Sequence, residues 1–246
     1  MKTTLIHFAF VLLLSLNSCY GQKTNESPDF QTTEDLKITS AEVNYQPELE
    51  LLIFSIEVKG NAGASVPAKA GQMDGAPVLG YVFPTSLSSE DVGFSKVEGI
   101  VALALTSHPD FDDTPLWDEN ANQVYDDDGV IWHPHWVVLR KDERVNGGLS
   151  VIEFKKADTS VTLPTTNPGM PMYMDSPGFP VITSGNTIKV VVPQYRMNNR
   201  KHFSFDAVTA YMQVNTSNAD LPLLGVYSVY SVASGDLSLP YRVSGL

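Results

Sequence analysis

Short apolar runs bounded by turn-forming residues constrain the fold of this chain more than any other feature. The runs are rich in Val, Ile, Tyr, Phe and Thr, and Gly and Pro occupy the gaps between them. No long stretch repeats its apolar residues with the 3.6-residue period of a helix. The pattern therefore predicts an all-β protein. The expected strands are Leu36–Tyr45, Leu49–Lys59, Val78–Phe83, Val97–Thr106, Val130–Arg140, Leu149–Phe154, Ile188–Tyr195, Phe203–Val214 and Leu224–Val232.

Two of these runs indicate how the strands are covered. In Phe203–Val214, the odd-numbered residues up to Tyr211 take one face and the even-numbered residues take the other. Val97–Thr106 is apolar on both faces apart from Glu98 and Thr106, which is typical of a central, covered strand. Many short strands of this kind predict an antiparallel β-sandwich with long loops, formed as a single domain by residues 36–246.

The N-terminal segment has the organisation of a secretory signal peptide. Met1 and Lys2 provide a positive start, and an apolar run follows from Leu5 to Leu14. A transmembrane helix needs about twenty residues, so this run is too short to span a bilayer. We expect residues 1–19 to be the signal peptide. Residues 20–35 are polar and aperiodic, and we expect them to form a flexible tether.

The end of this segment carries a resemblance to a known class of protein. Leu16-Asn17-Ser18-Cys19 resembles the lipobox of bacterial lipoproteins, although Asn17 is a less usual residue at its position. The resemblance implies that Cys19 is lipidated. It also implies export to the periplasm or cell surface, with a lipid anchor in the outer membrane if the source is bacterial. The alternative is ordinary signal cleavage near Ser18 or Gly21.

Composition excludes several classes of function. Cys19 is the only cysteine, so the exported domain has no internal disulfide, thiolate metal ligand or thiol nucleophile. The net charge of −12 leaves no broad basic face for a nucleic acid. No sequence signature of a serine hydrolase, a zinc protease, a phosphate-binding loop or a dinucleotide fold is present. We therefore predict no catalytic residue and favour a binding or structural role.

Residues 107–136 combine many carboxylates with three of the five histidines. The spacing of Asp118, Asn120 and Asn122 resembles the opening of an EF-hand calcium loop, because oxygen ligands alternate along a turning chain. The resemblance stops at Gln123 and Gly129, which replace the turn glycine and the bidentate glutamate. An irregular oxygen cage for calcium is the remaining interpretation, and a solvated acidic turn is its alternative. The proposed calcium ligands are Asp118, Asn120, Asp126 and Asp128.

The same region contains a second candidate metal site. His133 and His135 are two residues apart in an expected strand, so their imidazoles project from the same face. One transition-metal ion could bind both, with His108 or a nearby Asp as a third ligand. The His-x-His pair also resembles that of cupin barrels, but Leu139 and Arg140 stand where cupins have a glutamate. The alternative is a pair of polar residues on a partly exposed strand.

Two further features allow other functions. Met170, Met172 and Met174 alternate in an extended segment and would present thioethers on one face, which suits Cu(I). Aromatic residues near the acidic region, such as Trp117 and Trp136, would stack on a sugar or pack in the core. The sequence thus predicts an exported β-sandwich with a metal centre formed by residues 107–136. Its alternatives are a metal-dependent enzyme using His133 and His135, a periplasmic copper-binding protein and a calcium-dependent carbohydrate-binding module.

Overall fold

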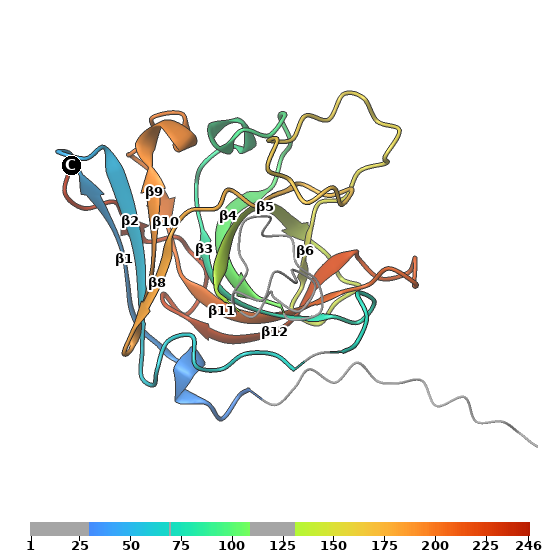
Figure 1. The fold of residues 1–246 in the computed structure, drawn as a ribbon, viewed down its shortest axis with the longest axis horizontal. Coiled ribbons are helices and arrows are strands. Elements are labelled where there is room, and N and C mark those ends of the chain that lie inside the picture. The colour runs from blue at the N-terminus through green and yellow to red at the C-terminus, as the bar shows by residue number, and fades with distance from the viewer. Residues whose placement is uncertain (1–29, 69, 109–130) are drawn as a thin grey trace, which may run out of the picture.

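The computed structural model describes residues 30–68, 70–108 and 131–246 (Figure 1). Within this part of the chain, all regular structure is β-strand apart from three short 3-10 helices. The 3-10 helices are η1 (Glu34–Leu36), η2 (Ser89–Val92) and η3 (Gln194–Met197). None of the described helices is long and apolar enough to cross a membrane. The predicted all-β class is confirmed.

Six antiparallel strands form a closed barrel, which appears end-on as a ring in Figure 1. The strand order is β4-β3-β11-β12-β6-β5, and direct pairing of β4 with β5 closes the ring. The short strand β7 extends this sheet at β5. The bounds are β3 (Pro77–Pro84), β4 (Ile100–Ser107), β5 (His133–Lys141), β6 (Leu149–Val151), β7 (Met174–Asp175), β11 (Val208–Val214) and β12 (Leu224–Val232).

A second sheet lies beside the barrel, with strand order β1-β2-β9-β8 (Figure 1). Its strands are β1 (Ile38–Gln46), β2 (Leu51–Val58), β8 (Val181–Ser184) and β9 (Thr187–Pro193). A two-stranded sheet pairs β10 (Ser204–Phe205) with β13 (Tyr241–Arg242). The antiparallel pairing was predicted. The arrangement differs from the predicted sandwich, because one of the two packed layers is the wall of a closed barrel.

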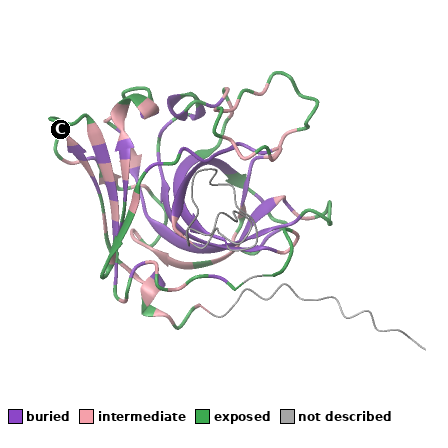
Figure 2. Cartoon of the chain, viewed as in Figure 1, coloured by how far each residue is buried: buried purple, intermediate pink, exposed green. Residues whose placement is uncertain are grey.

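Strand alternation produces two separate cores. Outward-facing residues of the barrel, including Phe83 and Trp136, pack against the inner face of the four-stranded sheet. Phe54 of β2 lies at the centre of this layer, with its ring centroid 5.3 Å from that of Phe83 and 6.4 Å from that of Trp136. Inward-facing residues form the second core inside the barrel. This double coverage makes β4 buried on both faces, as predicted, and Figure 2 shows the barrel wall as largely buried.

Small inward-facing residues keep the barrel interior open. A six-stranded barrel is narrow, since barrels of about eight strands have interiors that side chains just fill. Here the inward positions include Ala102, Ala104 and Ala210. Gly80 of β3 also faces inward, where an added Cβ would lie 2.7 Å from the terminal methyl carbon of Met212. These residues leave space that larger side chains would occupy.

Candidate metal centre

The three predicted histidines meet at one end of the barrel. His133 and His135 are the first and third residues of β5, and His108 directly follows β4. In the register that closes the barrel, Thr106 pairs with His133 and Ala104 pairs with His135. Alternation turns His108 inward, because Ala104 and Thr106 already face the interior. The pairing of two neighbouring strands therefore assembles the cluster.

The cluster is compact and buried. His108, His133 and His135 are 2%, 3% and 3% exposed. One ligand atom from each residue can be chosen so that all three lie within 4.8 Å of one another. The closest approach is 2.6 Å, between Nε2 of His108 and Nε2 of His133. Among the described residues, these three histidines alone make up the group, and no carboxylate belongs to it.

Second contacts orient two of the rings. His133 Nδ1 lies 3.0 Å from the carbonyl oxygen of Ile131. A carbonyl can only accept, so Nδ1 carries the proton and donates it, which leaves the Nε2 lone pair directed at the cluster. His135 Nδ1 lies 3.1 Å from the hydroxyl oxygen of Ser176, and Ser176 is the residue that directly follows β7. Metal-binding histidines usually have such an outer partner on their second nitrogen.

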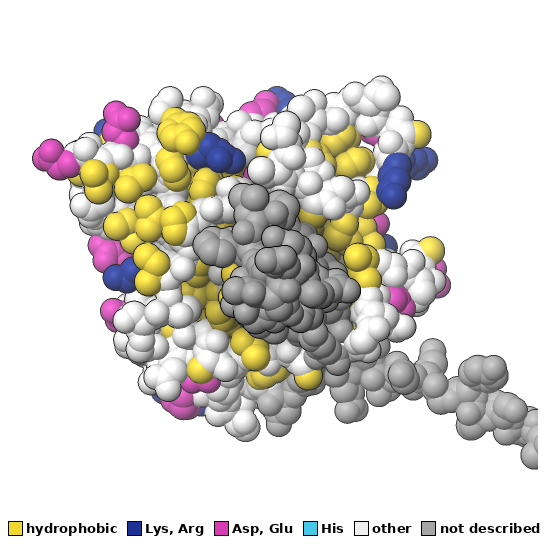
Figure 3. Space-filling view, in the orientation of Figure 1, with side chains coloured by type: hydrophobic (Ala, Val, Ile, Leu, Met, Phe, Trp, Pro, Cys, Tyr) yellow, Lys and Arg dark blue, Asp and Glu magenta, His cyan; other side chains and the backbone are white. Residues whose placement is uncertain are grey.

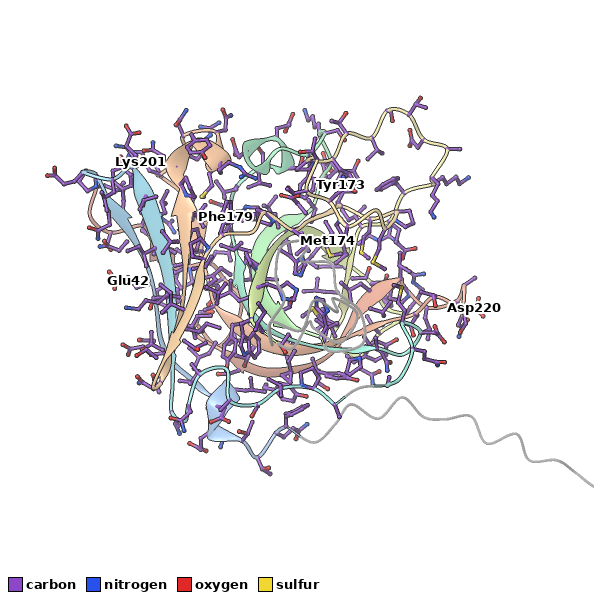
Figure 4. The ribbon with its side chains drawn as sticks, viewed as in Figure 1. Glu42, Tyr173, Met174, Phe179, Lys201 and Asp220 are labelled. Atoms are coloured by element: carbon purple, nitrogen blue, oxygen red, sulfur yellow. The ribbon has the colours of Figure 1, made fainter. Side chains whose placement is uncertain are left out.

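A cavity of about 300 Å³ runs through the barrel from this cluster. His108, His135 and Thr106 line one end, and the walls are almost entirely aliphatic and thioether side chains. Met170, Met172 and Met174 all line it, so the predicted placement of these thioethers on one face is confirmed. In Figure 4, Met174 borders the barrel opening. Its neighbour Tyr173 belongs to the core that lies outside the barrel, against the four-stranded sheet. Binding of Cu(I) by these residues stays a prediction.

One polar group in the cavity has no protein partner within the described part of the chain. Thr106 Oγ1 is buried, and it neither accepts nor donates a hydrogen bond with any described residue. A buried hydroxyl without a partner costs roughly 1–3 kcal/mol. Because Thr106 lines the cavity and pairs with His133, its hydroxyl lies in the same layer as the histidines. The sequence pattern treated Thr106 only as a polar break in an apolar strand.

Comparison with known proteins leaves the site to be interpreted from its geometry. No protein-family model, curated protein or solved structure matches the chain.

Asp175, the buried residue just before Ser176, is part of the barrel wall and does not belong to the histidine cluster. Asp175 pairs with Trp136 across β7 and β5, and it is 1% exposed. Burial raises the pKa of Asp175, and the hydrogen bond from the Thr166 hydroxyl, 2.6 Å long, opposes that rise. Asp175 therefore helps to fix the segment that carries Ser176.

The other predicted site residues cannot be placed in the structure. Asp118, Asn120, Asp126, Asp128 and Cys19 lie outside the described residues, so the calcium site and the lipid anchor stay predictions. Trp117 lies outside them too.

The two remaining tryptophans are packed against protein. Trp136 is 1% exposed in the outer core, and Trp132 donates a hydrogen bond of 2.9 Å to the Gly63 carbonyl. The Trp132 ring also packs edge-on against Tyr81, with centroids 4.8 Å apart. Trp136 therefore offers no exposed face on which a sugar could stack, whereas Trp132 is half-buried.

Proposed function

We propose that this chain binds a divalent transition-metal ion through His108, His133 and His135, and that the ion has an open coordination position facing the barrel cavity. The observation that supports this most is the convergence of three buried imidazoles from two adjacent strands. Imidazole nitrogen suits zinc, copper, iron and nickel, whereas calcium prefers oxygen ligands. The role proposed is binding, with the ion as the group that contacts a ligand.

The closest pair of ring nitrogens requires only a small adjustment to accept an ion. Zinc–nitrogen bonds of about 2.0–2.1 Å at tetrahedral angles place two ligand nitrogens about 3.3 Å apart. The Nε2 atoms of His108 and His133 are 2.6 Å apart, so they would separate by about 0.7 Å. Without an ion, one proton between these two nitrogens makes the contact an N–H···N hydrogen bond. Metal binding would replace that proton.

Elemental analysis of the protein tests this function. The full chain is purified without an affinity tag, and its metals are measured by inductively coupled plasma mass spectrometry. We expect about one transition-metal ion per chain, reduced at least tenfold in the His133→Ala/His135→Ala double variant. His202→Ala is the matched control, because His202 is exposed and lies outside the cluster. Circular dichroism verifies that the double variant folds. A wild-type protein without transition metal, or with calcium alone, would contradict the proposal.

A metal-dependent enzyme is the second candidate function. Catalytic zinc sites use three protein ligands and keep a fourth position for water or substrate, and three histidines form one such set. The cavity beside His108 and His135 favours an open position of this kind. Hydrolysis of a small ester by the metal-loaded protein, lost in the double variant, would support this candidate over simple binding.

We also propose that the chain is exported and anchored to a membrane by lipid on Cys19. The support is the lipobox-like sequence ending at Cys19 together with the short apolar run before it. Mass spectrometry of the N-terminal peptide tests the anchor. A diacylglyceryl mass on Cys19, absent in Cys19→Ser, is expected. An unmodified N-terminus near Gly21 would instead indicate ordinary cleavage.

A further inference from the structure

The cavity inside the barrel has apolar walls along most of its length. The inward-facing residues of the barrel strands supply these walls, and almost all of them carry aliphatic or thioether side chains. In the described part of the chain, no Asp, Glu, Lys or Arg lines the cavity. Sugars and nucleotides carry many polar groups that such walls would leave without hydrogen bonds. The walls therefore favour an aliphatic ligand.

The hydroxyl groups at the end of the cavity away from the histidines already bind the backbone. Thr85 and Ser86 line the cavity directly after β3, at the end opposite to the histidine cluster. The Thr85 hydroxyl donates a hydrogen bond of 2.8 Å to the Val101 carbonyl oxygen. The Ser86 hydroxyl accepts one of 2.9 Å from the backbone N–H of Ser204. These groups stabilise the wall, so this end also favours an apolar ligand.

Part of the cavity lining is both apolar and exposed to solvent. Ile100, Val229 and Leu237 all line the cavity and are 36%, 42% and 38% exposed. Leu237 and Leu239 lie between β12 and β13 with φ values of +59° and +54°, a backbone conformation that leucine rarely adopts. Strained backbone of this kind is often found at ligand sites. An exposed apolar surface that continues into a buried apolar cavity is typical of the entrance to such a site.

The cavity is narrow, which favours a ligand without branches. Barrels of about eight strands have interiors that side chains just fill, so a six-stranded barrel leaves little width. Gly80 of β3 pairs with Ala210 of β11, and Ala104 faces inward on the neighbouring strand β4. These small side chains make room along one side of the barrel. Met172 and Met174 also line the cavity, and flexible thioether side chains adapt their shape to a ligand.

The volume of the cavity limits the length of the ligand. It measures about 300 Å³, at the lower end of the range of roughly 300–1,000 Å³ that is usual for ligand pockets. At about 30 Å³ per small group, it accommodates about ten non-hydrogen atoms. One chain of medium length fits this space, and a membrane lipid with two long chains does not.

We propose that the barrel cavity binds one unbranched aliphatic chain of about eight to ten carbons. The chain lies against Ala104 and Ala210 and enters past Ile100 and Leu237. The walls make the contacts on which this inference depends, so it goes beyond the metal centre proposed above and does not rest on it. 1-Octanol is the probe, because it combines such a chain with a small neutral end group.

Isothermal titration calorimetry on the full chain compares 1-butanol, 1-hexanol, 1-octanol and 1-decanol. Each further methylene that enters the cavity should tighten binding about fourfold, and the gain should stop near 1-decanol, when the cavity is full. The branched isomer 2-propyl-1-pentanol has the same atoms as 1-octanol and should bind at least tenfold more weakly. Affinity that does not depend on chain length, or equal binding of the two isomers, would overturn the inference.

A variant that fills the cavity locates the bound chain. Ala210→Leu adds three carbon atoms to a wall residue that is 3% exposed, so 1-octanol should bind at least tenfold more weakly. The longest chain that still gains affinity should be shorter by about three carbons. Ala219→Leu makes the same change at an exposed position outside the cavity and should bind like the wild type. Circular dichroism verifies folding, and Ala210→Val replaces Ala210→Leu if the latter does not fold. Unchanged chain-length dependence in the folded variant would contradict binding inside the barrel.

Metal content, measured in the same samples, separates this inference from the metal centre. The titrations are repeated after removal of metal with a chelator, and the dependence on chain length should be the same. Metal-loaded protein that does not distinguish the chain lengths would overturn this inference and leave the metal centre standing. Protein that contains no metal and still shows the expected dependence would overturn the metal centre alone.

Discussion

At the scale of single residues, the candidate centre depends on which nitrogen of each histidine carries its proton. The Ile131 carbonyl oxygen accepts a hydrogen bond from Nδ1 of His133, so the proton of His133 lies on Nδ1. The Ser176 hydroxyl contacts Nδ1 of His135. Sequence spacing predicted that His133 and His135 share a face, which the structure confirms through their common inward orientation in β5. The contact with Ser176 was not predictable, because Ser176 is distant in sequence and reaches His135 only through the pairing of β7 with β5.

Removing the outer partner of His135 should weaken metal binding without removing a ligand. In Ser176→Ala, we expect metal affinity to fall about tenfold, because the imidazole loses the contact that orients it. Competition with a chromophoric chelator measures the change. Ser184→Ala is the control, since Ser184 is an exposed residue of β8. Equal affinities for the wild type and Ser176→Ala would show that Ser176 does not orient the ligand.

A second residue-scale prediction concerns Asp142, at the far end of β5. Arg144 and Ser150 both donate hydrogen bonds to its carboxylate, and Arg144 is the main cause that holds the pKa of Asp142 far below its ordinary value. A lowered folded-state pKa adds stability above the ordinary value near 3.8, and this contribution is lost as the pH falls below that value.

Asp142→Asn should therefore lower the free energy of unfolding by about 2 kcal/mol at pH 7. The difference from the wild type should shrink as the pH falls below about 4. Urea unfolding at pH 7 and at pH 3 measures both values. A difference that stays constant across this range would argue against an ionic contribution from Asp142.

At the scale of elements, the pairing of β4 with β5 does two things at once. It closes the barrel, and it brings His108 to the pair on β5. The sequence predicted β4 as a covered strand, which is confirmed. It could not show that His108 reaches His133, because the contact depends on the register of Thr106 with His133. A register shift of one residue would turn the histidines of β5 to the outer face.

The connection between β12 and β13 also carries a testable consequence. Leu237 has a left-handed backbone conformation, which costs an L-residue roughly 1–2 kcal/mol. Leu237→Gly should relieve this strain and raise the free energy of unfolding by about 0.5 kcal/mol. Leu49→Gly is the control: Leu49 is exposed, and no left-handed strain is found there. A loss of stability in Leu237→Gly equal to that in Leu49→Gly would refute the strain argument.

At the scale of the whole molecule, two cores share one barrel wall. Apolar residues on both faces of a strand indicate that both faces are buried, but they do not distinguish two flat sheets from a sheet that closes on itself. The small inward residues Gly80, Ala104 and Ala210 made closure around a cavity feasible, and their common location could be recognised only once the strand order was known. On the face seen in Figure 3, acidic and basic side chains are scattered in small groups among polar and apolar ones. No basic surface for a nucleic acid stands out on that face.

The central claim is that three histidines hold one metal ion inside the barrel. X-ray absorption spectroscopy at the metal edge of the purified protein tests it most directly. We expect about three imidazole nitrogens at about 2.0–2.1 Å from the metal, with a further light-atom ligand in the open position. A shell containing only oxygen, or one dominated by sulfur from Met170, Met172 and Met174, would contradict it.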